Sequence, residues 1–216
     1  MIKITSLQTI AGALLAFGLS AAPAEAQANR TFVSGKGTDR GACGFAAPCR
    51  SFAFALNQTN AKGEIDVLDP AGYGTVTITK AISLVNDGVG LAAIAAPSGT
   101  AITITAGGGD SVHLRGLTID GFGSGSNGIQ FNAGGNLEIE NCVARDFTNA
   151  GISISPSTSS SFSVSNTIAS NNPGTGIFVH PIGSATVSAC SAESRRTIMV
   201  FRESMWMARR PRDRSI

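Results

Sequence analysis

The sequence predicts an all-β fold of the solenoid type, and three observations support this prediction. Residues 112–119, 137–144 and 162–169 align with one another at offsets of 25 residues, and a weaker fourth copy begins at Ala185. The second, third and fourth copies each follow a short segment of the pattern Gly-Ile-x-apolar, at residues 128–131, 151–154 and 176–179. Both kinds of segment alternate apolar and polar side chains, as strands do. Such a turn buries its apolar side only when the next turn stacks on it, which is typical of a solenoid.

Residues 1–28 are expected to form a secretory signal peptide. Lys3 is followed by an apolar run over residues 10–19 and by small residues that end at Ala26 or Ala28. A charged start, a short apolar middle and an Ala-x-Ala end are typical of a segment that is removed on export. Neither this run nor a later one reaches the ~18 apolar residues of a membrane span. We therefore expect a secreted or periplasmic protein without a membrane span.

Residues 29–62 are predicted to close the N-terminal end of the solenoid. Ser51 can cap a short helix whose Phe52, Ala55 and Leu56 share one face. A helix placed before the first coil covers the open end of the apolar core and hides the edge of the sheet.

The four cysteines are expected to form two different pairs. Cys43 and Cys49 flank a five-residue loop, and export makes disulfides available, so we expect a disulfide in the cap. Cys142 and Cys190 fall in one column of the repeat, two rungs apart. Because rungs lie about 4.8 Å apart, their Cα atoms should be about 9.6 Å apart, which is too far for a disulfide.

Residues 63–190 are predicted to form the coils. The first turn contains Ile65 and Val67, followed by residues 76–78 and 82–84. The repeat predicts two stacks of inward side chains, one of Ile102/Ile104, Ile129/Phe131, Ile152/Ile154 and Ile177/Val179, the other of Leu114, Ile139, Val164 and Val187. Asn141 and Asn166 share a column between two strands, where an internal stack of asparagines can satisfy backbone groups at a tight corner. We expect these two residues to be structural.

Two segments and the coils together resemble a known family. The cap contains Ala-Pro-Cys-Arg-Ser-Phe at residues 47–52, and Gly-Glu-Ile-Asp-Val-Leu-Asp-Pro follows at residues 63–70. With the coils, these segments resemble the right-handed parallel β-helix proteins of the pectate-lyase-like superfamily, and more closely the secreted bacterial β-helix-repeat proteins without assigned activity. The resemblance implies a right-handed parallel β-helix of about four to five coils with a short N-terminal helix. It implies little about function, because the superfamily includes lyases, hydrolases, esterases and non-enzymes.

In the enzymes of this superfamily, the active site lies on the outer face of the sheet formed by the Gly-Ile-x-apolar strands. Period-two alternation places eight residues on that face here, namely Thr103, Thr105, Gln130, Asn132, Ser153, Ser155, Phe178 and His180. None is a carboxylate, so neither a calcium site nor a pair of acids for glycoside hydrolysis is expected. We therefore assign no catalytic residue, metal or cofactor. Amide and hydroxyl groups can bond sugar hydroxyls, and an aromatic ring can stack on a pyranose. The candidate glycan contacts are Gln130, Asn132, Ser153, Ser155, Phe178 and His180.

Charged residues fall opposite one another on a neighbouring wall. The repeat places His113 beside Glu138 and Arg115 beside Glu140, and such cross-strand pairs contribute roughly 0.2–1 kcal/mol and help to fix the register. Asp120 and Arg145 fall opposite each other in the same way. Residues 29–190 contain eight Lys or Arg and ten Asp or Glu, so no basic surface for nucleic acid is expected.

The repeat stops at Ser191. Residues 191–216 contain seven Arg, three acidic residues, no Gly and the only Trp, Trp206. So abrupt a change is typical of a frameshift in a longer β-helix gene. The alternative is a basic amphipathic anchor for anionic surfaces. A frameshift would leave the last coil uncapped, which predicts self-association through its open edge.

These observations favour a secreted, non-catalytic β-solenoid that contacts extracellular glycans. Two alternatives remain: a polysaccharide lyase or hydrolase of the superfamily, which the missing carboxylates disfavour, and a truncated fragment without a function of its own.

Overall fold

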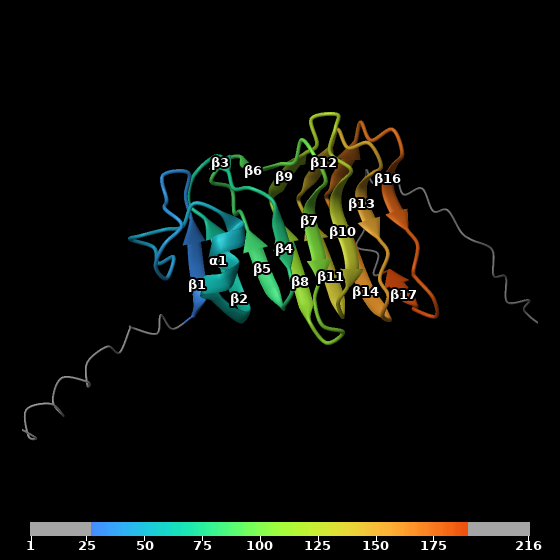
Figure 1. Ribbon diagram of the computed structural model, residues 1–216, viewed down its shortest axis with the longest axis horizontal. Helices are drawn as coiled ribbons and strands as arrows, with labels where there is room; N and C mark the ends of the chain where they lie inside the picture. The colour runs from blue at the N-terminus through green and yellow to red at the C-terminus, as the bar shows by residue number, and fades with distance from the viewer. Residues whose placement is uncertain (1–26, 190–216) are drawn as a thin grey trace, which may run out of the picture.

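The computed structural model describes residues 27–189, which wind into a right-handed parallel β-solenoid of about five turns (Figure 1). The predicted all-β architecture is confirmed, and the one helix within residues 27–189 is short and lies near their N-terminal end. Most of the expected signal peptide, the tail from residue 191 and Cys190 lie outside the described residues. Within residues 27–189, no helix has the length and apolar character that crossing a lipid bilayer requires.

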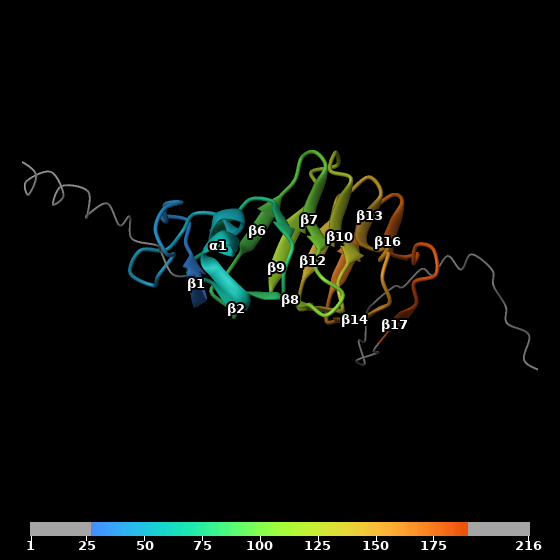
Figure 2. The same ribbon diagram turned by 60° about the horizontal axis from the view of Figure 1, so that its bottom comes forward.

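Three parallel sheets form the walls of the solenoid, and their coils stack along one axis (Figure 2). Sheet A consists of β1 (Ala28–Val33), β2 (Thr59–Val67), β5 (Ile82–Val85), β8 (Ser111–Arg115), β11 (Asn136–Glu140), β14 (Ser160–Ser165) and β17 (Val187–Ala189). Sheet B consists of β3 (Ala71–Gly72), β6 (Ala92–Ala95), β9 (Leu117–Asp120), β12 (Val143–Arg145) and β15 (Ile168–Ser170). Sheet C consists of β4 (Val76–Ile78), β7 (Thr100–Thr105), β10 (Asn127–Ala133), β13 (Ala150–Ile154) and β16 (Thr175–Val179).

The core is a set of apolar columns that run through the coils. In sheet C, Ile102, Ile129, Ile152 and Ile177 pair in register, as do Ile104, Phe131, Ile154 and Val179. This confirms the predicted inward layers. A shift of one residue would turn every apolar side chain of a strand toward solvent, so burial fixes this register strongly.

The structure corrects the predicted register of the last coil. Val187 pairs with Ser160, at an offset of 27 residues, and therefore does not stack on Val164. The reason is the connection between β16 and β17, residues 180–186, which is two residues longer than the connection between β13 and β14. The sequence repeat predicted that Val187 follows Val164 at an offset of 23 residues.

The expected distance between Cys142 and Cys190 assumed that both residues lie in one column, and the corrected offset of 27 residues removes this assumption. Cys190 itself lies outside the described residues. Cys142 is a free thiol in the core, and burial raises its pKa to about 11. A buried thiol of this kind is unreactive, because the thiolate is the nucleophile.

The corners between sheets A and B contain left-handed residues. Gly116, Asn141 and Asn166 have φ angles of 71°, 54° and 46°, a region that Gly and Asn tolerate best. The two asparagines therefore form the tight corners that were predicted. Their side chains are exposed rather than stacked inside, because the chain turns outward at each corner.

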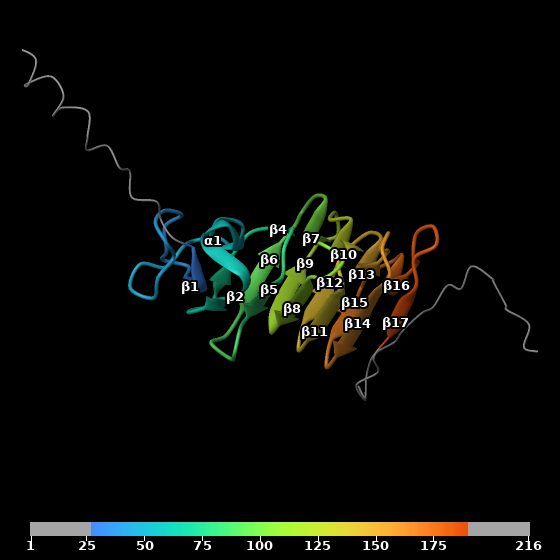
Figure 3. The ribbon, with the colours of Figure 1, turned by 90° about the horizontal axis from the view of Figure 1, so that it is seen from below.

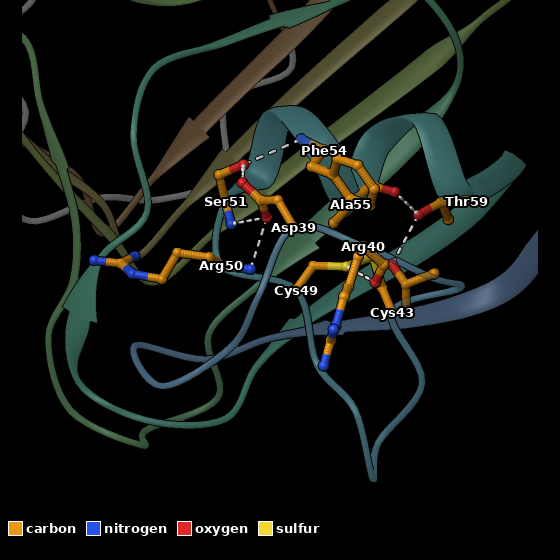
Figure 4. Close-up of a disulfide and its surroundings, with 10 residues drawn as sticks. Asp39, Arg40, Cys43, Cys49, Arg50, Ser51, Phe54, Ala55 and Thr59 are labelled. Atoms are coloured by element: carbon orange, nitrogen blue, oxygen red, sulfur yellow. Dashed lines mark hydrogen bonds between the residues drawn. A yellow bond between two sulfur atoms is a disulfide. The ribbon is translucent and has the colours of Figure 1, made fainter.

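The N-terminal cap contains the expected disulfide between Cys43 and Cys49, whose Cα atoms are 4.9 Å apart (Figure 4). Helix α1 (Phe52–Gln58) is capped at its N-terminus by Ser51, whose hydroxyl accepts a hydrogen bond from the Phe54 amide at 3.2 Å. Asp39 in turn accepts a hydrogen bond from the Ser51 hydroxyl at 2.7 Å. The buried face of α1 joins the apolar core, and the helix packs against β1, β2 and β4.

Candidate functional site

A row of uncharged side chains runs along the outer face of sheet C. Its five members pair in register across the five strands, namely Thr77, Thr103, Gln130, Ser153 and Phe178. They face outward because their neighbours on each strand are buried in the core or packed against it. We call this set the sheet C row. With strands about 4.8 Å apart, the row is about 19 Å long.

The second predicted row, two residues further along each strand, is interrupted. A β-bulge between Phe131 and Ala133 pairs Thr105 with Ala133, so Asn132 does not face Thr105 as strict alternation predicted. Asn132 instead accepts a hydrogen bond from Gln130 Nε2 at 3.1 Å. Gln130 Oε1 accepts another from the Thr100 hydroxyl at 3.2 Å. Gln130 and Asn132 therefore lie side by side, with their amides held in place, at the middle of the face.

The serines of β13 are less accessible than the sequence suggested. Ser153 is only 8% exposed, between Gln130 and Phe178 on the neighbouring strands. Its hydroxyl lies 3.4 Å from that of Ser155, which is half-buried. Ser155 can therefore reach a ligand more easily than Ser153.

An aromatic pair stands at the C-terminal end of the row. The ring centroids of Phe178 and His180 are 5.9 Å apart, and the rings are tilted by 34°. Phe178 is half-buried and His180 is exposed. The two rings offer an apolar surface with a polar edge beside a row of hydroxyl and amide groups.

A groove of about 410 Å³ lies at the opposite end of the row, between α1 and β4. Its lining is polar and threonine-rich, and consists of Ala53, Leu56, Asn57, Thr75, Val76, Thr77, Thr79 and Thr100. Thr77 belongs to both the groove and the sheet C row, so the two are continuous. The sequence prediction omitted this groove. The alternation of Thr75, Thr77 and Thr79 could have indicated an outer face, whereas the position of α1 beside it could not be predicted.

The outer face of sheet A differs, because several of its charged side chains form ion pairs with one another. Arg115 pairs in register with Glu140, and its Nε lies 3.8 Å from Glu140 Oε2 and 3.1 Å from Asp87 Oδ1. Arg30 forms ion pairs with Glu64 and Asp66 on β2. Burial together with the nearby Asp66 carboxylate raises the pKa of Glu64.

His113 occupies the predicted position opposite Glu138. Its Nε2, however, lies 3.9 Å from Glu140 Oε2, and the expected contact with Glu138 is replaced by this one. Glu138 is exposed. The backbone register was predictable from the repeat, but the choice of partner depends on how each side chain turns.

The chemistry available on the sheet C face is hydrogen bonding and ring stacking. Neither of its two rows contains a carboxylate, and glycoside hydrolysis normally uses two. In the part of the chain that the structure describes, no three His, Cys, Asp or Glu side chains are grouped so that they could hold a metal ion. The assignment of no catalytic residue, metal or cofactor remains a prediction.

Comparison with known proteins places the chain in a family. A family model of the right-handed β-helix region matches residues 72–205, a range that includes every strand from β4 to β17 and continues beyond the last described residue. Neither a search of curated proteins nor a search of solved structures found a match. The family match and the three-walled solenoid agree on the same architecture. The chain therefore belongs to the right-handed β-helix family.

Proposed function

We propose that this protein is an exported, non-catalytic β-helix that binds neutral polysaccharide along the outer face of sheet C. The observation that carries this proposal is the uncharged sheet C row, which joins the groove beside α1 to the aromatic pair Phe178 and His180. Hydroxyl and amide groups can both donate to and accept from sugar hydroxyls. The Phe178 ring can stack on the apolar face of a pyranose.

The direction of the row supports a chain-like ligand. Its side chains repeat at the strand spacing of about 4.8 Å, a distance similar to the length of one sugar unit in an extended polysaccharide. Successive sugars could therefore meet successive rungs. Gln130 and Asn132 would contact the middle of the chain, and Ser155 and the aromatic pair would contact one end.

Export is supported by the charged and apolar N-terminal segment and by the disulfide of the cap, since disulfides persist in oxidising compartments. Gln27 Nε2 donates to the Asn57 carbonyl at 2.6 Å, and Ala28 pairs with Thr59. Cleavage after Ala26 keeps both contacts, whereas cleavage after Ala28 removes them. We therefore propose a secreted or periplasmic protein that begins at Gln27, and the intact mass of the exported protein checks this.

A glycan array probed with the purified protein tests the binding proposal. We expect binding to neutral polysaccharides that changes little with salt or with a calcium chelator, because the proposed contacts are uncharged. Gln130→Ala should weaken this binding, and Glu138→Ala, on the outer face of sheet A, should leave it unchanged. Binding restricted to acidic glycans and lost in salt would contradict the proposal.

Assays of product release test the non-catalytic part. We expect no unsaturated or reducing sugars from pectin-type polymers, with or without Ca²⁺. Sustained product formation by the pure protein, abolished by substitutions on the sheet C face, would instead favour a lyase or hydrolase.

A further inference from the structure

The outer face of sheet B carries an uncharged, largely apolar column whose residues grow in size along the solenoid axis. Gly72, Ala93, Thr118, Val143 and Ile168 pair in register on β3, β6, β9, β12 and β15, four strands of which are labelled along the solenoid in Figure 3. Ile168 is 54% exposed, although it is β-branched and apolar. None of the five residues is charged, and none is needed for the sheet C row.

A second column on the same face carries one positive and one negative charge on neighbouring strands. Asp120 on β9 pairs in register with Arg145 on β12, and Arg145 Nε lies 2.9 Å from Asp120 Oδ2. The Arg145 side chain is 47% exposed and the Asp120 side chain 16%, and Arg145 Nε also lies 3.7 Å from Asp146 Oδ2. A further partner therefore reaches Arg145 more easily than Asp120. The column is completed by Ala95 and Ser170.

Two copies of this face are complementary when a two-fold axis relates them. The axis runs parallel to the strands, in the plane between the two copies, and passes between β9 and β12. It reverses the order of the strands and keeps each position along them. Small residues then face large ones, with Ala93 opposite Ile168 and Thr118 opposite Val143. In the second column Asp120 faces Arg145 of the other copy. A contact of this kind is isologous, as in most homodimers.

We propose that the outer face of sheet B is a self-association surface, on which a second copy of this chain packs. The solenoid axes of the two copies are antiparallel, and their strands run in the same direction. The size gradient keeps the combined thickness of facing side chains nearly constant, which allows close packing. The charges form two equivalent cross-copy pairs and disfavour a parallel arrangement, in which like charges would meet. A dimer of this form leaves both sheet C faces accessible and presents two glycan-binding rows, which raises the effective affinity for a long polymer.

The face is built from short strands, so the dimer is expected to be weak, with a dissociation constant on the order of 10–100 µM. Sedimentation velocity from about 1 to 200 µM protein measures it. The charge variants Asp120→Arg and Arg145→Asp should each remain monomeric throughout, because like charges then face each other across the axis. An equimolar mixture of the two should recover the dimer, since both cross-copy pairs are again of opposite sign. Glu138→Arg, a charge reversal on sheet A, is the matched control and should dimerise like the original protein.

Circular dichroism of each variant separates loss of association from loss of folding. Should a charge variant fail to fold, Ile168→Lys replaces it, because this exposed position belongs to no ion pair and the substitution should weaken the dimer at least ~10-fold. Three results would overturn the proposal: a monomer at every concentration, folded charge variants that associate like the original protein, or a mixture that stays monomeric. Association that survives all these substitutions would arise elsewhere, for example at the end of the last coil.

Discussion

The outer faces of sheets A and C cover the same core and are formed by the same coils, yet their polar side chains differ in charge and in how they are paired. On sheet A, the positive charge of Arg115 is met by two carboxylates of the same chain, Glu140 and Asp87. On sheet C, the row from Thr77 to Phe178 contains no charge, and only part of its hydrogen-bonding capacity is used internally. A solenoid can therefore hold its register with one wall and present a binding surface with another.

The largest effect is expected from the core that both faces share. Phe131 is completely buried beneath the sheet C face, and Phe131→Ala should lower the free energy of unfolding by about 3–5 kcal/mol through the cavity it leaves. Urea denaturation measures the loss, with the exposed Glu138→Ala as control. A loss below about 1 kcal/mol would mean that the coil closes around the cavity and that the two faces do not depend on one packed core.

A carboxylate at a corner should have the next largest effect. Asp69 accepts hydrogen bonds from the Gly35 amide at 2.6 Å, the Tyr73 hydroxyl at 2.7 Å and the Ser34 hydroxyl at 2.7 Å. These bonds, that of Gly35 first, hold the pKa of Asp69 below its usual value of 3.8. Asp69→Asn should cost about 1–2 kcal/mol near neutral pH, a modest figure because the carboxylate is partly exposed.

The pH dependence of that substitution has a definite sign. The folded pKa lies below the unfolded one, so the stabilisation by Asp69 is present above the unfolded value of 3.8 and is lost as pH falls through the folded pKa. The melting temperatures of the original protein and Asp69→Asn should begin to approach each other below about pH 4 and become equal only below the folded pKa. A difference that persists unchanged at low pH would show that hydrogen bonding to the charged form is not the cause.

The smallest effect is expected on sheet A. A double-mutant cycle of Arg115→Ala and Glu140→Ala should give a coupling of roughly 0.2–1 kcal/mol, reduced by salt. A cycle between Glu138→Ala and Arg115→Ala is the matched control, because Glu138 lies opposite His113 instead. A coupling above about 2 kcal/mol would give sheet A a larger structural role than its partly exposed pairs predict.

The sequence predicted the walls well and their details less well, for physical reasons. Leu114, Ile139 and Val164 follow one another at 25 residues and pair in register, because a slip of one residue would expose every apolar side chain. The position of Val187 was predicted wrongly because residues 180–186, which precede it, are mostly exposed. Burial therefore does not fix how many residues this connection contains. Asn132 left its predicted row because a bulge is a local backbone event that alternation does not encode.

In the candidate site, the row of residues was predictable from the sequence, whereas their accessibility and the neighbouring groove were not. Gln130 and Phe178 lie in one row, as alternation and the repeat required. The burial of Ser153 and the groove beside α1 depend on side-chain conformation and on where the helix lies, which the pattern of residues does not specify.

The most direct test of the two-face account is calorimetric titration of a neutral oligosaccharide, chosen from the glycan array, into Phe178→Ala and Arg115→Ala. We expect Phe178→Ala to weaken binding about tenfold, as the loss of one ring stack would, and Arg115→Ala to bind like the original protein. Circular dichroism confirms that both variants remain folded. Weaker binding by Arg115→Ala, with Phe178→Ala unaffected, would place the binding surface on sheet A and contradict the account.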